Sequence, residues 1–130
     1  MLKNFSVINI SVKNSKSIKD VDKKTVSYYD SYGNNGRDYC DKVLDFLRDD
    51  HLSRKGLPLG TQWTTETVQN LPRQKNGYDC GIYCMTFGEY ISRGKSVADI
   101  TSSINDLVMP LYRQMICFEL LVQNLYSKSP

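Results

Sequence analysis

The chain has 130 residues, of which 40% are hydrophobic and 24% charged, and its formal net charge at pH 7 is +3. These values are typical of one globular domain, or part of one, and the small net charge does not indicate nucleic-acid binding. No apolar run is long enough to cross a bilayer, and residues 1–10 lack the pattern of a secretory signal. We therefore expect an intracellular protein of the nucleus or cytoplasm, with no membrane partner.

The first part of the chain predicts two strands followed by a helix. Residues 5–12 and 23–29 are β-rich, and the polar residues 13–22 between them predict a hairpin loop. Residues 30–36 contain glycine and asparagine, which tolerate positive φ, so a turn should end the second strand. Residues 38–50 have helical spacing. The apolar side chains on the expected buried face of this helix are Tyr39, Val43, Phe46 and Leu47.

The middle of the chain predicts a loop and a third strand. Residues 51–60 contain two glycines and a proline and should form a connecting loop, whereas residues 61–68 are β-branched enough for a strand. Within that strand, Trp63 is expected to pack against the sheet or the core.

The last part predicts three helices. Residues 79–92 are apolar almost all round, which is typical of a buried helix, and Gly94 should end it. Ser96 is the expected N-cap of a shorter helix that reaches residue 107. A final helix should run to about residue 125, because Pro110 suits its first turn and its apolar positions have helical spacing.

The four cysteines, at positions 40, 80, 84 and 117, do not have the spacing of a zinc site. In a reducing compartment they should be free thiols. We expect core positions for Cys40, Cys84 and Cys117, and the sequence indicates neither a metal nor an organic cofactor.

The most informative stretch is residues 71–84, Leu-Pro-Arg-Gln-Lys-Asn-Gly-Tyr-Asp-Cys-Gly-Ile-Tyr-Cys. It places Cys80 at the expected first turn of a helix, where free N–H groups and the helix dipole favour a thiolate. Gln74, six residues earlier, could donate a hydrogen bond to an oxyanion. Gly81 would let a substrate backbone approach closely. The structural alternatives are a buried core cysteine and a solvated loop glutamine.

Gln-Lys-Asn-Gly-Tyr-Asp-Cys-Gly, at residues 74–81, resembles the signature of the Ulp/SENP cysteine proteases, adenain-like enzymes that cut SUMO and related modifiers. Residues 23–31 are similar to the family's strand that ends in the catalytic Asp, and residues 109–115 to the start of its C-terminal helix. The resemblance covers nearly the whole chain. It implies an α+β, papain-like or adenain-like fold, in which a small mixed sheet packs on a buried central helix.

The resemblance also implies roles for single residues. Cys80 would be the nucleophile, and Gln74 the oxyanion donor together with the backbone N–H of Cys80. Asp30 would orient a histidine, although an Asp that caps Ser31 or Gly33 in a turn is the alternative. Gly81 would line the path of the substrate.

One departure from the family pattern concerns the histidine. The family carries a His-Trp pair on the strand before the Asp strand, and the corresponding positions here hold Leu2 and Lys3. The only histidine, His51, follows the Asp strand and lies in a polar segment, so we interpret it as a solvated helix-terminal residue. Residues 1–130 are therefore expected to be either a single partial domain, whose N-terminal part is missing, or a degenerate protease that binds a modifier without cutting it.

The sequence thus predicts a cysteine-type peptidase that cleaves SUMO or a related ubiquitin-like modifier after its C-terminal glycine, acting as a monomer. Without a catalytic histidine, these residues alone should hydrolyse little or nothing. The alternative is a catalytically dead module that binds ubiquitin-like proteins. A peptidase of the same broad clan with another substrate also remains open.

Overall fold

The computed structural model describes residues 7–12 and 24–127. In chain order its elements are β1 (Val7–Val12), β2 (Lys24–Tyr29), α1 (Arg37–Lys55), β3 (Thr64–Thr67), α2 (Cys80–Ser92), α3 (Val97–Ser103) and α4 (Met109–Ser127). The mixture of strands and helices confirms the predicted α+β class. The loop expected at residues 13–22, and the first residues of both predicted strands, lie outside the described residues.

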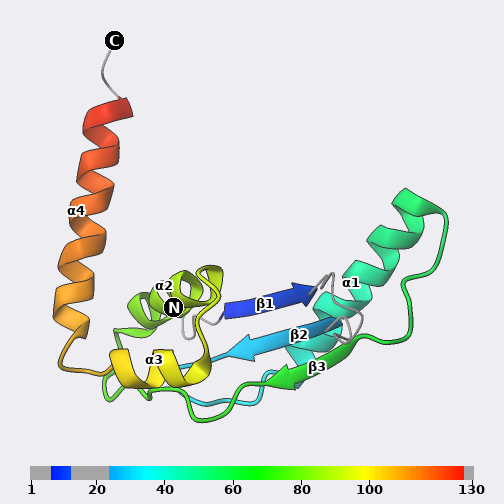
Figure 1. Cartoon of the computed structure of the whole chain (residues 1–130), viewed down its shortest axis with the longest axis horizontal. Helices are drawn as coiled ribbons and strands as arrows, with labels where there is room; N and C mark the ends of the chain where they lie inside the picture. Colours follow the sequence, from blue (N-terminus) through cyan, green and yellow to red (C-terminus); the bar gives the residue numbers. More distant parts are fainter. Residues whose placement is uncertain (1–6, 13–23, 128–130) are drawn as a thin grey trace.

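Within the described residues the sheet has the order β1-β2-β3 and is mixed, as predicted. β1 is antiparallel to β2, with Val7 opposite Tyr29 and Val12 opposite Lys24. β3 is parallel to β2, which no tight turn can achieve, so the chain crosses over through α1. Figure 1 shows α1 beside one end of the strands, whereas α2 and α3 lie beyond the other end.

α1 buries only part of the face that its sequence predicted. Val43 and Leu47 are half-buried against the sheet, as expected. Cys40 and Leu44, one turn apart, are buried against Val26 and Tyr28 of β2, and the half-buried Trp63 packs against the same cluster, as expected. The predicted face included two aromatic residues that are instead largely exposed, Tyr39 at 57% and Phe46 at 65%. Size explains the difference, because the small Cys40 side chain fits where β2 approaches closely. The Tyr39 ring instead stacks on the Tyr28 ring, with 5.8 Å between the ring centroids.

α1 is also longer than predicted. It runs to Lys55 and ends at Gly56, which has φ of 66° and donates its N–H to Leu52 O. A left-handed residue of this kind is a common helix stop, so the predicted loop at residues 51–60 is shortened by one helical turn.

α2 is the central helix of a second core cluster, but it is not buried all round. Tyr83 and Phe87 are buried with Ile100, Ile104 and Met109 from the segments that follow. On the opposite face Met85 is 48% exposed, which corrects the expectation of a fully buried helix. The reason is that α4 does not close on this face: a groove of about 330 Å³ lies between the two helices, lined in part by Met85 and Leu120.

The remaining helices begin where predicted and end differently. Ser96 caps α3 in a capping box with Asp99, as its residue type indicated. The helix ends at Ser103, four residues early, because Ile104 turns to an extended conformation and buries its side chain in the core. α4 carries several exposed apolar side chains and extends away from the rest of the molecule (Figure 1). None of the described helices has the length and hydropathy needed to span a membrane.

Gly36, just before α1, provides a test of the packing between α1 and the sheet. A Cβ built at this position would lie 1.9 Å from Cγ of Tyr28. Gly36→Ala should therefore lower the free energy of unfolding by about 2 kcal/mol or more, because the ring is buried and has little room to move. Urea denaturation would measure this. Gly60→Ala is the matched control, since nothing lies within 4 Å of a Cβ at Gly60. Equal losses in the two variants would contradict this packing.

Candidate active site

Cys80 is the first residue of α2, as the motif predicted. The N–H groups of a first helical turn lack intrahelical partners and carry the positive end of the helix dipole. The preceding residue, Asp79, makes no side-chain capping hydrogen bond to this turn. Cys80 is nearly covered but keeps 7% of its surface exposed. Its thiol therefore lies beside a cluster of N–H donors that no capping side chain occupies.

The carboxylate of Asp79 is turned to other partners. It accepts a hydrogen bond of 2.8 Å from Asn76 Nδ2 and forms an ion pair with Arg113 of α4. Asn76 also organises the loop before α2, because its Oδ1 accepts from the backbone N–H of Tyr78 at 3.1 Å and of Asp79 at 2.9 Å. This local pattern is a known habit of asparagine, and it fixes how the chain enters the helix.

Gln74 is buried, with 8% of its surface exposed, and is not the solvated loop residue of the alternative interpretation. Ser31 Oγ donates to Gln74 Oε1, and Gln74 Nε2 donates to Asn76 O at 2.8 Å. The backbone N–H of Gln74 also donates to Ser31 O at 3.1 Å. These bonds fix the orientation of the amide. Because an amide nitrogen carries two hydrogens, the Asn76 bond leaves one for a further acceptor.

Asp30 follows β2 directly and is buried. Its Oδ1 accepts from Tyr32 N at 2.8 Å, and its Oδ2 accepts from Asn34 N, Asn34 Nδ2 and the Tyr28 hydroxyl at 3.2, 2.8 and 3.3 Å. The carboxylate therefore does hold a turn, but through residues 32 and 34 rather than the expected 31 and 33. Gly33 occupies that turn with φ of 74°, as its residue type predicted. Oδ1 keeps room for a second donor.

The predicted site residues are joined through their neighbours. Ser31, next to Asp30, bonds to Gln74; Gln74 bonds to Asn76; and Asn76 bonds to Asp79, next to Cys80. Two segments far apart in the sequence, around residues 30–31 and 74–80, are thus joined by one largely buried hydrogen-bond network. Gly81, the expected substrate-side residue, lies half-buried in the first turn of α2.

His51 lies elsewhere. It is within α1, fourteen residues after the helix begins, and its Nδ1 is 2.8 Å from Leu57 O. At 1.5 Å per residue it stands about 20 Å along the helix from the start that adjoins the Asp30 turn. This position agrees with the interpretation of His51 as a residue of the helix end.

All four cysteines are free thiols. Cys40 is buried, as expected, and burial raises its pKa, with Asp41 and Glu66 adding to the effect. Cys84, one turn after Cys80, is half-buried, and its pKa is raised by burial first and then by the neighbouring Cys80. Cys117 is exposed on α4, so the expected core position was wrong. Its neighbours Met115 and Phe118 on this helix are also largely exposed.

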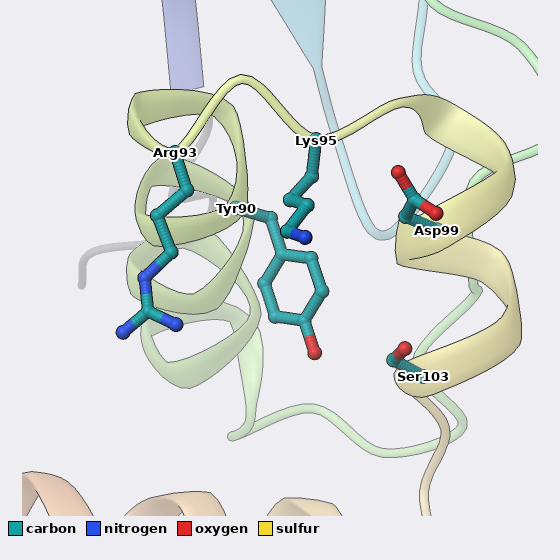
Figure 2. Close-up of a pocket in the computed structure, with 5 residues that line it drawn as sticks. All are labelled: Tyr90, Arg93, Lys95, Asp99 and Ser103. Carbon is teal, nitrogen blue, oxygen red and sulfur yellow. The ribbon is translucent and has the colours of Figure 1, made fainter.

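A further pocket, of about 200 Å³, lies at the other end of α2 (Figure 2). It is lined by Tyr90, Arg93, Lys95, Asp99 and Ser103. Tyr90 contributes to packing there, since its hydroxyl is 3.1 Å from that of Tyr112, and this bond raises the pKa of Tyr112 to about 12. Because it lies at the C-terminal end of a 13-residue helix, this pocket is separate from the Cys80 site.

Sequence reasoning missed three residues that organise the site: Ser31, Asn76 and Arg113. The first two had usable signals, because Ser31 adjoins the predicted Asp and Asn76 precedes a glycine in a loop, where asparagine commonly holds turns. Arg113 had none, since its partner is 34 residues away in the sequence.

Fold and site together define an α+β domain with a cysteine at the start of its central helix and a buried, oriented glutamine in the loop that leads into that helix. The family model described as "Ulp1 protease family, C-terminal catalytic domain" matches residues 7–125. The chain belongs to this family.

Curated relatives agree with this assignment. Human sentrin-specific protease 2 is 32% identical over 109 residues, which is 82% of this chain and 18% of that protein. A sentrin-specific protease of Caenorhabditis elegans is 27% identical over 112 residues, covering 85% of this chain and 15% of the relative. Ubiquitin-like-specific protease 1A of Arabidopsis thaliana is 25% identical over 91 residues, 69% and 18% of the two chains. The chain thus spans less than a fifth of the length of these relatives.

Proposed function

We propose that this chain carries the nucleophile side of a cysteine-type peptidase site that cleaves a SUMO-type modifier after its C-terminal glycine. Cys80 is the nucleophile, Gln74 and the Cys80 N–H hold the oxyanion, and Asp30 orients a histidine. The observation that carries the proposal is the fixed Gln74 amide, joined by hydrogen bonds to the loop that presents Cys80. Family membership and the names of the relatives support the choice of substrate.

The proposed reaction has two steps. The Cys80 sulfur attacks the carbonyl carbon of the terminal glycine, and the oxyanion that forms accepts hydrogen bonds from Gln74 Nε2 and a backbone N–H. When the intermediate collapses, the C–N bond breaks, the amine leaves with a proton, and a thioester remains on Cys80. Water then hydrolyses the thioester and restores the thiol. Gly81 offers no side chain that would obstruct the modifier's terminal residues.

Proton transfer in both steps needs a base, which His51 is too distant to supply. We therefore expect residues 1–130 alone to turn over modifiers very slowly. As part of the same proposal, the fold is papain-like or adenain-like, the residues form the C-terminal portion of the peptidase domain, and the protein acts as a monomer in the nucleus or cytoplasm. No nucleic acid, membrane, metal or cofactor takes part.

Covalent capture tests the nucleophile without requiring turnover. We expect the chain to react with a SUMO-type modifier whose C-terminal glycine carries a vinyl sulfone, and mass spectrometry to locate the bond at Cys80. Cys80→Ala should abolish capture, whereas Cys117→Ala, which removes the exposed thiol, should leave it unchanged. Capture at Cys117, or equal capture of a free Gly-Gly vinyl sulfone, would contradict the proposal.

The alternative is a module that binds a ubiquitin-like protein without cutting it. The observation behind this alternative is the position of His51, which bonds to Leu57 O at the end of α1, far along the helix from the Asp30 turn. Tight binding of the unmodified modifier, together with no reaction of Cys80 with the vinyl sulfone, would support it over the peptidase.

A further inference from the structure

Arg113 and Asp79 form an ion pair at the entrance to α2. The Asp79 side chain is 11% exposed and the Arg113 side chain 46%. Asp79 is the residue immediately before Cys80, and Arg113 reaches it from the first turns of α4. The pair thus joins the C-terminal helix to the start of the helix that carries the thiol.

An aspartate in this position would ordinarily work against an anionic site. Asp is among the preferred N-cap residues, and its carboxylate usually accepts hydrogen bonds from the first-turn N–H groups. Those are the groups that a thiolate or an oxyanion at Cys80 would use. An unpaired carboxylate next to the thiol would also repel the negative charge that forms there. In this structure Asp79 makes no capping bond, and its two partners are Arg113 and Asn76.

We propose that Arg113 is a positioning residue, which holds the Asp79 carboxylate away from the first turn of α2 and offsets its charge, so that the N–H groups there stay open to an anion at Cys80. The inference rests on the proposed role of Cys80 as nucleophile. Asn76 shares the task, since its Nδ2 holds the other carboxylate oxygen at 2.8 Å. Among the described residues, the titratable side chains near Cys80 include Asp79, which is paired with Arg113, and Cys84, one turn further along α2.

The test measures how fast Cys80 in the 130-residue chain is alkylated by iodoacetamide at pH 7, with each cysteine followed by peptide mass spectrometry. The two single variants should move in opposite directions. Arg113→Gln leaves the carboxylate unpaired, so alkylation should slow about fivefold, as expected for one partly screened charge nearby. Asp79→Asn leaves the arginine without its partner, so alkylation should accelerate about threefold. The double variant should return to within about twofold of the parent.

A purely structural tie between α2 and α4 would give another pattern. In that case the alkylation rate of Cys80 would change in the same direction in both single variants, and the rate of the double variant would not return to that of the parent. Each of these two results would overturn the inference. At pH 10, above the ordinary pKa of a thiol, the parent and Arg113→Gln should react at similar rates, because access to the sulfur is unchanged. Unequal rates at that pH would also overturn it.

Two comparisons keep the result interpretable. Arg93→Gln breaks an exposed ion pair with Glu89 at the far end of α2 and should leave the rate unchanged. Alkylation of the buried Cys40 reports unfolding of the chain. If Cys40 becomes reactive in Arg113→Gln, that variant is set aside, and Asp79→Asn alone decides: faster alkylation of Cys80 supports the inference and slower alkylation overturns it. Because alkylation requires no peptidase activity, the predicted order could hold even if the modifier probe fails to react, so the two proposals can fail separately.

Discussion

Replacing Gln74 with alanine is expected to slow modifier cleavage by about a hundred- to a thousandfold, the usual cost of removing one oxyanion donor. The assay needs a base, so it uses a chimera in which the part of human sentrin-specific protease 2 upstream of its matched region precedes residues 7–130. The loss should appear in kcat rather than KM, because an oxyanion exists only during the reaction. Initial rates with a SUMO-type precursor measure both.

Two further variants separate donation from packing. Gln74→Glu keeps the shape and the acceptor for Ser31 Oγ but replaces the N–H donors with a carboxylate oxygen, so it should be at least as slow as the alanine variant. Gln69→Ala changes an exposed residue in the same segment between β3 and α2. Its cleavage rate should stay within about twofold of the parent, as is usual for surface substitutions. A Gln74→Ala chimera within threefold of the parent would show that Gln74 is not an oxyanion donor.

The sequence predicted what depends on short-range chemistry. The strand at Lys24–Tyr29, the start of α2 at Cys80 and the Ser96 cap all follow from residues within a few positions of one another. The Cys80 motif is also local, so its placement at a helix mouth, with Gln74 in the preceding loop, could be stated in advance. The sheet order and the parallel pairing of β3 were not expected in detail, because they depend on how α1 crosses over.

What failed depends on neighbours that lie far apart in the chain. The buried face of α1 was only partly predicted, because helical spacing permits more than one apolar stripe. Val43 and Leu47 pack as expected, but contact with β2 buried Cys40 and Leu44 and left Phe46 exposed. The Arg113–Asp79 pair joins residues whose sequence separation hides their contact. The exposed Met85 follows from how far α4 stands from α2, which composition cannot reveal.

Asp30→Ala is expected to lower the free energy of unfolding by about 3–5 kcal/mol, because it leaves several donors without their acceptor in a largely covered site. Two of them are backbone N–H groups, of Tyr32 and Asn34, which cannot turn away without opening the loop between β2 and α1. Urea denaturation of the 130-residue chain measures the loss. Asp49→Ala, on the exposed side of α1, is the control and should change stability by less than about 0.5 kcal/mol. A loss below 1 kcal/mol for Asp30→Ala would contradict the structural role of this carboxylate.

Asp30→Asn distinguishes that structural role from the orientation of a histidine. An amide oxygen at the Oδ2 position can still accept from Asn34, but the amide nitrogen then faces the N–H of Tyr32, so we expect an intermediate loss of about 1–3 kcal/mol. In the chimera the folded Asn variant should nevertheless be slow, because an amide donor cannot hold a histidine N–H or stabilise the imidazolium that forms. Full activity in a folded Asp30→Asn chimera would leave Asp30 as a turn residue alone. Low activity with a retained fold would assign it both roles, since the turn uses mainly one carboxylate oxygen and the other remains open to a histidine.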